Sequence, residues 1–384
     1  MNLGSVDFSK ELPQNGKIYL NNASVSIMPY SSINEMKDFL IRYNSLGPDS
    51  IDSEKFLKQR LMQIRKKISN VIHCKPEEIV FTQSTTDGIN LVASGLLFEK
   101  KSNLIIRGMR HEHHANFYPW LRLSQKTSLR SLKTDQNGFF DVKELHNSVD
   151  SETKCVVLSH ALYNTGSVLP VEEIGEYLQK RNVSYFLDIA QTVGCFGDYD
   201  FKRTKSDFMS FNGSKWLCGP MGTGIFYCKK ESSELLEPVS IGGESAMIYD
   251  DDKLAYKDIP DRFQTGFRNY VGFVGLEASI DFLLKFGLDN IRKKVMKLSN
   301  LMRTELSNMS GVTLYGPNND SQRTSIVSFT MDRLEPEQIV EKLEKKNIVL
   351  AIREILDKKI VRASPHFFNS EEEIQKVLEE IKKL

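Results

Sequence analysis

The sequence has no long apolar run, no excess of charge of one sign and few cysteines. No stretch approaches the roughly 20 apolar residues that a membrane-spanning helix needs, and residues 1–17 lack the apolar core of a secretory signal, so we expect a cytoplasmic protein with no membrane partner. Lys and Arg number 51 against 50 Asp and Glu, which gives no reason to expect nucleic acid as a partner. The cysteines include no CxxC pair, which disfavours a disulfide framework or a zinc site. They are Cys74, Cys155, Cys195, Cys218 and Cys228.

Residues 77–229 alternate between short β-rich runs and amphipathic stretches. The continuous apolar run at 183–189 is typical of a strand buried on both faces. Helical patterns at 87–98 and 171–180 separate some of the runs, so we expect an α/β fold with a mainly parallel seven-stranded sheet flanked by helices. The expected strands cover residues 77–83, 103–108, 128–134, 155–161, 183–189, 207–213 and 223–229.

After about residue 255 the pattern changes to that of a smaller α+β domain. A chain of 384 residues exceeds one ordinary core, so we expect an N-terminal segment over 1–25, a large domain over 26–255 and a small domain over 256–384. We expect the polar stretch at 250–257 to be a surface loop. The small domain is predicted to contain helices at 272–309, 335–346 and from 371, with strands at 312–316, 325–331, 348–354 and 359–365.

A single lysine, Lys215, follows the end of one expected strand and precedes a glycine-rich turn at residues 219–224. Open α/β sheets bind their ligands at the ends of strands. The turn reads G-P-M-G-T-G, which matches neither the dinucleotide-binding fingerprint nor the P-loop. Taken alone, the pattern favours a surface lysine over a functional one.

Other polar residues stand at comparable strand ends. Asp188 ends the apolar strand, where a carboxylate must be paired, cap a turn or shift its pKa, and Gln191 follows it closely. Thr85 and Thr86 precede an expected helix, where hydroxyl and N–H groups form either an anion site or an ordinary N-cap. Arg362, on a late strand, offers a fork for a carboxylate or a surface salt bridge.

The histidines His111, His113 and His114 suggest a metal site at first sight. Their H-x-H-H spacing lacks the i, i+4 pattern of helical zinc ligands, and no carboxylate or cysteine partner is evident. A metal-dependent hydrolase centred on these residues remains an alternative, but we assign no metal. A flat imidazole stacked on an aromatic cofactor is the better use of one of these rings.

In this order the motifs resemble the class V aminotransferase family, which includes cysteine desulfurases, selenocysteine lyases and isopenicillin N epimerases. The resemblance covers nearly the whole chain, from IYLNNASVSIMP at 18–29 to VRASPHFFNSEEEI at 361–374. Between these it includes HEHHANFYPW at 111–120, FLDIAQTVG at 186–194 and the long match around the lysine at 207–227. It implies an enzyme of fold type I that uses pyridoxal 5′-phosphate (PLP), acts on a small amino acid and forms a homodimer with its active sites at the subunit interface.

The resemblance also implies a role for each of the matched residues. They are Lys215 (the Schiff-base lysine and proton shuttle), His113 (stacked on the PLP ring), Asp188 (the partner of the pyridine nitrogen), Gln191 (a donor to the phenolic oxygen), Thr85 and Thr86 (the phosphate pair) and Arg362 (the substrate carboxylate).

Several positions depart from the pattern of cysteine desulfurases. Ser214, after Asn212 and Gly213, stands where desulfurases have a histidine, so we expect Asn212 and Ser214 to make altered cofactor contacts. Phe267 replaces the threonine that would reach the neighbouring subunit's phosphate, and Arg268 could compensate. Tyr163 replaces an asparagine beside the substrate, which implies that it contacts the substrate here.

The largest departure is a missing cysteine. Desulfurases carry one on a loop between two arginine-bearing strands, whereas only residues 354–361 separate Arg353 from Arg362, and no cysteine follows Cys228. We therefore expect a C–S lyase or an aminotransferase, with a desulfurase or epimerase as the alternative within the family. Outside the family's chemistry, a PLP-binding module without catalysis also remains open.

Overall fold

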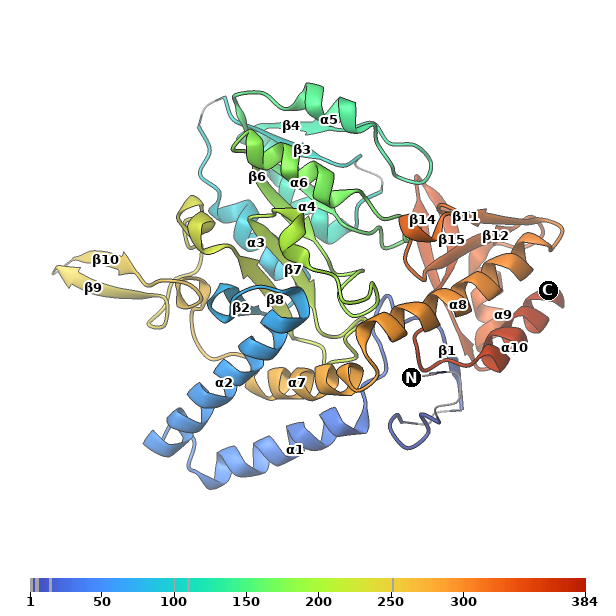
Figure 1. The fold of residues 1–384 in the computed structure, drawn as a ribbon, viewed down its shortest axis with the longest axis horizontal. Helices are drawn as coiled ribbons and strands as arrows, with labels where there is room; N and C mark the ends of the chain where they lie inside the picture. Colours follow the sequence, from blue (N-terminus) through green and yellow to red (C-terminus); the bar gives the residue numbers. More distant parts are fainter. Residues whose placement is uncertain (1–2, 4–6, 14–15, 100, 109–110, 251) are drawn as a thin grey trace.

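The computed structural model describes residues 3, 7–13, 16–99, 101–108, 111–250 and 252–384. Its centre is a seven-stranded sheet in the order β2-β8-β7-β6-β5-β3-β4 (Figure 1). β8 is antiparallel to both of its neighbours, β2 and β7, and the other four pairs are parallel, so the prediction of a mainly parallel sheet is confirmed. The strands are β2 (Ile79–Thr82), β3 (Asn103–Ile106), β4 (Ser128–Ser131), β5 (Thr153–Ser159), β6 (Ser184–Asp188), β7 (Phe208–Asn212) and β8 (Gly224–Cys228).

Both faces of this sheet are buried because its strands are apolar at successive positions. On β6, Tyr185 and Leu187 belong to one core cluster and Phe186 to another, as the two-residue period of a strand requires. One cluster includes buried residues of α2 (Ile51–Ile72), α6 (Val171–Lys180) and α7 (Tyr270–Leu284). The other includes α3 (Thr85–Gly95) and α4 (Tyr118–Arg122). The remaining helices of residues 1–284 in the described chain are the short α5 (Val142–Ser148) and α1 (Tyr30–Ser45), which packs against α7.

A second sheet with the order β11-β12-β15-β14 lies beside the first (Figure 1). Its strands are β11 (Val312–Tyr315), β12 (Val327–Met331), β15 (Lys358–Ala363) and β14 (Ala351–Ile355). Buried residues of α8 (Leu288–Ser307), α9 (Pro336–Glu344) and α10 (Glu371–Lys382) form a separate core cluster with it. The N-terminal β1 (Ile18–Tyr19) joins this part of the molecule by pairing with β13 (Ile348–Val349).

Two details of the sequence prediction were wrong. The helical region expected over 272–309 is two helices, because Gly287, with a φ of +79°, ends the path of α7 and precedes α8. The surface loop expected at 250–257 contains a hairpin of β9 (Ala246–Asp250) and β10 (Lys253–Tyr256), which projects from the body in Figure 1. The domain boundaries at residues 25 and 255 stay predictions. Among the described residues, no helix combines the length and apolar character needed to cross a membrane.

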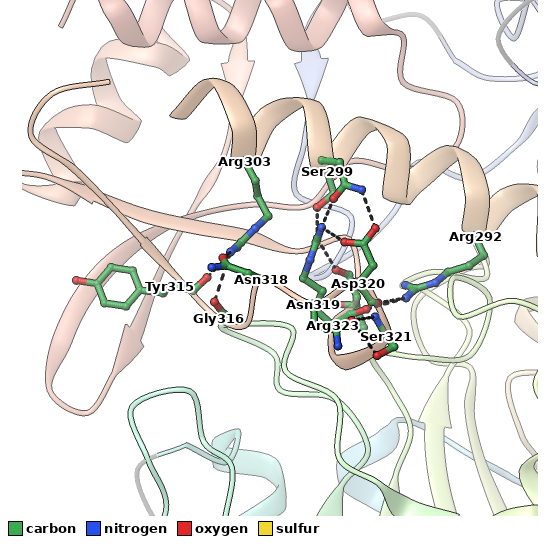
Figure 2. A network of polar contacts seen from close by, with 12 residues as sticks. Arg292, Ser299, Arg303, Tyr315, Gly316, Asn318, Asn319, Asp320, Ser321 and Arg323 are labelled. Carbon is green, nitrogen blue, oxygen red and sulfur yellow. Dashed lines mark hydrogen bonds and ion pairs between the residues drawn. The ribbon is translucent and has the colours of Figure 1, made fainter. Parts of the chain in front are cut away.

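A network of arginines fixes the loop before β12 onto α8 (Figure 2). The buried guanidinium of Arg323 donates to Ser299 Oγ at 2.8 Å and pairs with Asp320 Oδ1 at 2.6 Å. Arg292 donates to the carbonyls of Asp320 and Arg323 at 3.1 and 2.8 Å. Because the next backbone N–H, that of Thr324, donates to the carbonyl of Gly166 at 2.9 Å, this network also supports the segment that follows Tyr163.

Candidate active site

A cavity of about 270 Å³ lies at the carboxyl ends of the central strands. Asp188 ends β6, Asn212 ends β7, and Lys215 follows in the loop to β8. The cavity brings together nine of the ten predicted site residues, and Ser214 alone among them does not line it. Those nine are Thr85, Thr86, His113, Tyr163, Asp188, Gln191, Asn212, Lys215 and Arg362.

Asp188 is buried, Lys215 is half-buried, and the charge of each acts on the pKa of the other. Burial lowers the pKa of the Lys215 amine to about 8, while the nearby Asp188 acts in the opposite direction. Burial raises the pKa of the Asp188 carboxyl to about 6, and the positive charge of Lys215 opposes that rise. Asp188 Oδ1 also accepts from the backbone N–H of Ala190 at 2.9 Å. The amine can therefore exchange protons near neutral pH, as a proton shuttle must.

The N-terminus of α3 forms one end of the cavity. Ser84 caps the helix by accepting from the backbone N–H of Asp87 at 3.1 Å. Thr85 Oγ1 and Asn212 Oδ1 are buried and have no hydrogen-bond partner among the described residues. Hydroxyl and N–H groups at a helix N-terminus are suited to a phosphate, so these residues fit the phosphate end of PLP.

Ser214 lies outside this cradle. It is buried, and its carbonyl accepts from the backbone N–H of Ser26 at 2.8 Å. Its predicted contact with the cofactor therefore has no support from its position and stays a prediction. Arg268, which could have compensated for Phe267, pairs with Glu244 within the same chain.

The side chains of His111, His113 and His114 lie in three different environments. The ring of His113 lines the cavity and meets Tyr163 edge-on at 4.8 Å, whereas His114 stacks on Tyr118 and His111 is fully buried. His113 is exposed to the open cavity, but partial loss of hydration and the charge of Lys215 lower its pKa to about 3, so the ring is neutral at physiological pH, as stacking on an aromatic ring favours. Within the described part of the chain, no three His, Cys, Asp or Glu residues come together as a metal site would require.

Two arginines from the second sheet complete the cavity. Arg362 on β15 donates to the carbonyl of Tyr163 at 2.7 Å, to Asn21 Oδ1 at 3.0 Å and to Ser24 Oγ at 2.6 Å. Arg353 on β14 also donates to Ser24 Oγ. Burial, reinforced by the charge of Arg353, holds the pKa of Arg362 well below its usual value. Two adjacent guanidinium groups that repel each other provide a strong site for an anionic carboxylate.

Sequence reasoning missed several residues of the site. Ser24 and Asn21 lie within the matched segment at 18–29, which was the only signal for them. Glu112 is buried behind the cavity, where it accepts from the backbone N–H of Ser159 at 3.1 Å and from Asn116 Nδ2 at 3.2 Å. Ser159 Oγ, whose residue lines the cavity, donates to the same carboxylate.

The turn between β14 and β15 contains two residues only. Ile355 pairs with Lys358, which leaves Leu356 and Asp357 as the turn. Their φ angles of +53° and +79° are both positive, as a type I′ hairpin requires. At the position where the resemblance implied a cysteine-bearing loop, the structure therefore has a tight turn.

Comparison with known proteins decides the family. A model of the family described as "Aminotransferase class-V" matches residues 18–377. The chain belongs to this family. A probable cysteine desulfurase from Methanothermobacter thermautotrophicus is 32% identical over 95% of this chain and 94% of that protein.

Solved structures agree with this assignment. A cysteine desulfurase from Thermococcus onnurineus has a TM-score of 0.90 at 28% identity, covering 97% of this chain and 96% of that one. The cystine C–S lyase C-DES, in complex with its reaction product cysteine persulfide, has a TM-score of 0.87 at 25% identity, covering 96% and 98%. The predictions of a class V aminotransferase-family fold of type I, of an enzyme and of PLP as its cofactor are confirmed.

Proposed function

We propose that this class V aminotransferase-family enzyme is a C–S lyase that cleaves the Cβ–S bond of cysteine or cystine and releases the sulfur group into solution. The observation that carries the proposal is the two-residue turn between Arg353 and Arg362, which holds no thiol. None of the five cysteines is among the described residues that line the cavity. The cavity therefore offers no cysteine thiol that could accept sulfur from the substrate and become a persulfide.

In this proposal PLP, when bound, supplies an electron sink for the pair of electrons left at the substrate's Cα. Arg362 and Arg353 hold the substrate carboxylate. The Lys215 amine removes the proton from Cα, and the Cβ–S bond breaks with its electron pair on sulfur. The departing sulfur takes up a proton and leaves as hydrogen sulfide from cysteine or as cysteine persulfide from cystine. Asp188 keeps a proton near the pyridine nitrogen, and Thr85 with Thr86 holds the phosphate. Hydrolysis of the remaining three-carbon unit gives pyruvate and ammonia.

Product analysis tests this proposal directly. The PLP-loaded enzyme is incubated with cysteine and, separately, with cystine, and pyruvate, ammonia, sulfide, persulfide and alanine are measured. We expect pyruvate and ammonia in equal amounts, with sulfide from cysteine or cysteine persulfide from cystine. Lys215→Ala abolishes turnover, whereas Lys37→Ala, at an exposed lysine of α1, preserves it. Exchange of an amino group with a keto acid in place of pyruvate release would identify an aminotransferase and refute the proposal.

Cysteine desulfurase is the second candidate because the relative that is 32% identical to this chain is named a probable cysteine desulfurase. A desulfurase makes alanine, and its sulfur passes to a thiol as a persulfide. In this chain the thiol would have to come from another protein or a small molecule. Alanine formation that depends on added thiol, with no pyruvate, would favour this candidate over the lyase.

We also propose that the enzyme is a homodimer. A groove of about 820 Å³ lies between α2 and the segment around Phe267, whose side chain is 82% exposed. The β9–β10 hairpin nearby exposes Met247, Ile248 and Tyr249. Monomeric proteins rarely expose so many large apolar residues together, so a second copy is the occupant we expect.

Light scattering of the protein as it elutes from a size-exclusion column measures its molar mass and therefore its oligomeric state. We expect twice the mass of the chain for the wild type and dissociation for Ile248→Asp. Leu356→Asp, a similar change at the distant turn of the second sheet, is the control and should leave the mass unchanged. A wild type that elutes as a monomer would exclude the dimer.

A further inference from the structure

Trp216 follows Lys215 in the chain but lies behind the cavity wall. Its side chain is fully buried, whereas the side chain of Lys215 lines the cavity. The indole Nε1–H donates to Gln191 Oε1 at 2.9 Å. Gln191 Nε2 donates in turn to the carbonyl of Ala23 at 3.0 Å. A cavity-lining amide is therefore held at both ends by groups of the protein.

These two bonds fix which way the amide of Gln191 faces. An indole N–H can only donate, so it requires the oxygen of the amide on its side, and a carbonyl can only accept, so it requires the nitrogen on the other. The nitrogen carries two hydrogens, and the bond to Ala23 uses one of them. The second N–H of Gln191 Nε2 remains available to a group inside the cavity. The contacts with Trp216 and Ala23 fix which end of the amide carries this N–H.

The backbone of Trp216 is also fixed. Gly194, with a φ of +94°, lies so close that a Cβ there would be 2.6 Å from the carbonyl oxygen of Trp216. The same carbonyl is 3.1 Å from His366 Nε2. His366 Nδ1 accepts from the backbone N–H of Phe367 at 2.8 Å, so the ring proton resides on Nε2 and is donated to Trp216. The turn that bears Gln191 and Gly194 therefore packs directly against the loop that bears Lys215 and Trp216.

We propose that Trp216 is a positioning residue, which orients the amide of Gln191 so that one Nε2–H faces the phenolic oxygen of PLP. This inference rests on the proposed role of Gln191 as the donor to that oxygen. A donor there stabilises negative charge on the phenolic oxygen, so the bound PLP takes up a proton less readily. The visible absorbance band of the enzyme follows this proton uptake as the pH is varied. When the donor is lost, the proton binds more tightly and the midpoint of the titration rises.

A double-mutant cycle read by absorbance tests the proposal. The visible band of the PLP-loaded enzyme is titrated with pH in the wild type, Gln191→Leu, Trp216→Phe and the double variant. Each single change is expected to raise the midpoint by about 0.5 to 1 pH unit, the size that the loss of one hydrogen bond gives. In the Gln191→Leu background, Trp216→Phe is expected to add no further shift, because its effect passes through the amide.

The chain offers a matched control in its only other tryptophan. Trp120 is also fully buried and donates from Nε1 to a side-chain amide, that of Asn116, at 3.1 Å. Any shift caused by Trp120→Phe should be the same in the wild-type and Gln191→Leu backgrounds, since the two amides share no partner among the contacts described. Where Trp216→Phe does not fold, Trp216→Leu takes its place in the cycle.

The outcomes separate this inference from the proposed function. Shifts for Gln191→Leu and Trp216→Phe that are not additive support it. A shift for Gln191→Leu with none for Trp216→Phe, or additive shifts, means that Trp216 only anchors the Lys215 loop, and overturns it. No shift for Gln191→Leu overturns both this inference and the proposed role of Gln191. A wild type that takes up no PLP and shows no visible band would remove the proposed function itself.

Discussion

The buried amine of Lys215 should destabilise the cofactor-free protein at neutral pH. Its pKa is about 8 in the folded chain against 10.5 for an unperturbed lysine, mainly because burial disfavours the charged form. The folded chain therefore binds this proton less tightly than the unfolded chain. The penalty is complete below about pH 8 and disappears as the pH rises to about 10.5.

Lys215→Met removes the penalty and keeps most of the volume of the side chain. A pKa difference of this size corresponds to about 3 kcal/mol. Asp188 loses its nearby positive charge in the variant, which reduces the gain. We therefore expect cofactor-free Lys215→Met to be more stable than the cofactor-free wild type by about 2 kcal/mol at pH 7, and nearly equal to it by pH 10.

Urea unfolding at pH 7 and pH 10 measures this difference. The fluorescence of Trp120 and Trp216 reports unfolding because both side chains are fully buried. Lys37→Met, at an exposed lysine, is the control and should change the stability by less than about 0.5 kcal/mol at either pH. The reasoning is refuted if Lys215→Met is no more stable than the wild type at pH 7, or if its advantage is as large at pH 10 as at pH 7.

Three other substitutions test the remaining parts of the site. Asp188→Asn should weaken PLP binding by about 10- to 100-fold in an absorbance titration, because a hydrogen bond to a charged group contributes about 1.5–3 kcal/mol. Gly194→Ala should lower the free energy of unfolding by about 2 kcal/mol or more, since a Cβ at a φ of +94° would lie 2.6 Å from a carbonyl oxygen; unchanged urea midpoints would contradict this. Arg362→Lys should raise the KM for the amino acid about tenfold with a smaller change in kcat, because lysine cannot form the two-point contact.

The central sheet could be predicted because the local sequence pattern of its strands is distinctive. The run at 183–189 is mostly apolar, with Tyr185, Phe186 and Leu187 in succession, and polar residues follow it closely. The hairpin of β9 and β10 could not be predicted in this way, because Met247, Ile248 and Tyr249 are exposed in the chain and follow no alternation that a buried strand would require. The break between α7 and α8 depends on the positive φ of Gly287, a single residue within a long helical pattern.

The site was predictable only as far as single motifs allow. Asp188 and Thr85 stand at the ends of elements and Lys215 follows the end of β7, and the sequence pattern locates these ends. The contacts of Ser24 with Arg353 and Arg362 join residues 329 and 338 positions apart, and no local pattern specifies such a pairing. The bond between Trp216 and Gln191, which are 25 positions apart, was missed for the same reason.

Arg353 and Arg362 lie on the two strands of one hairpin, and the turn of that hairpin contains no cysteine. The same hairpin therefore bears on the proposed binding of the substrate and on where its sulfur is released. The register of β14 and β15 pairs Ala351 with Arg362 and Arg353 with Ile360, so both guanidinium groups remain at the cavity while the turn beyond them shrinks to two residues. The strands rather than the turn hold the arginines, so the proposed carboxylate site does not depend on the length of the turn. Under the proposed function, a chain that binds the amino acid here but has no thiol above it breaks the Cβ–S bond and releases the sulfur to solvent or to a separate acceptor, as a lyase does.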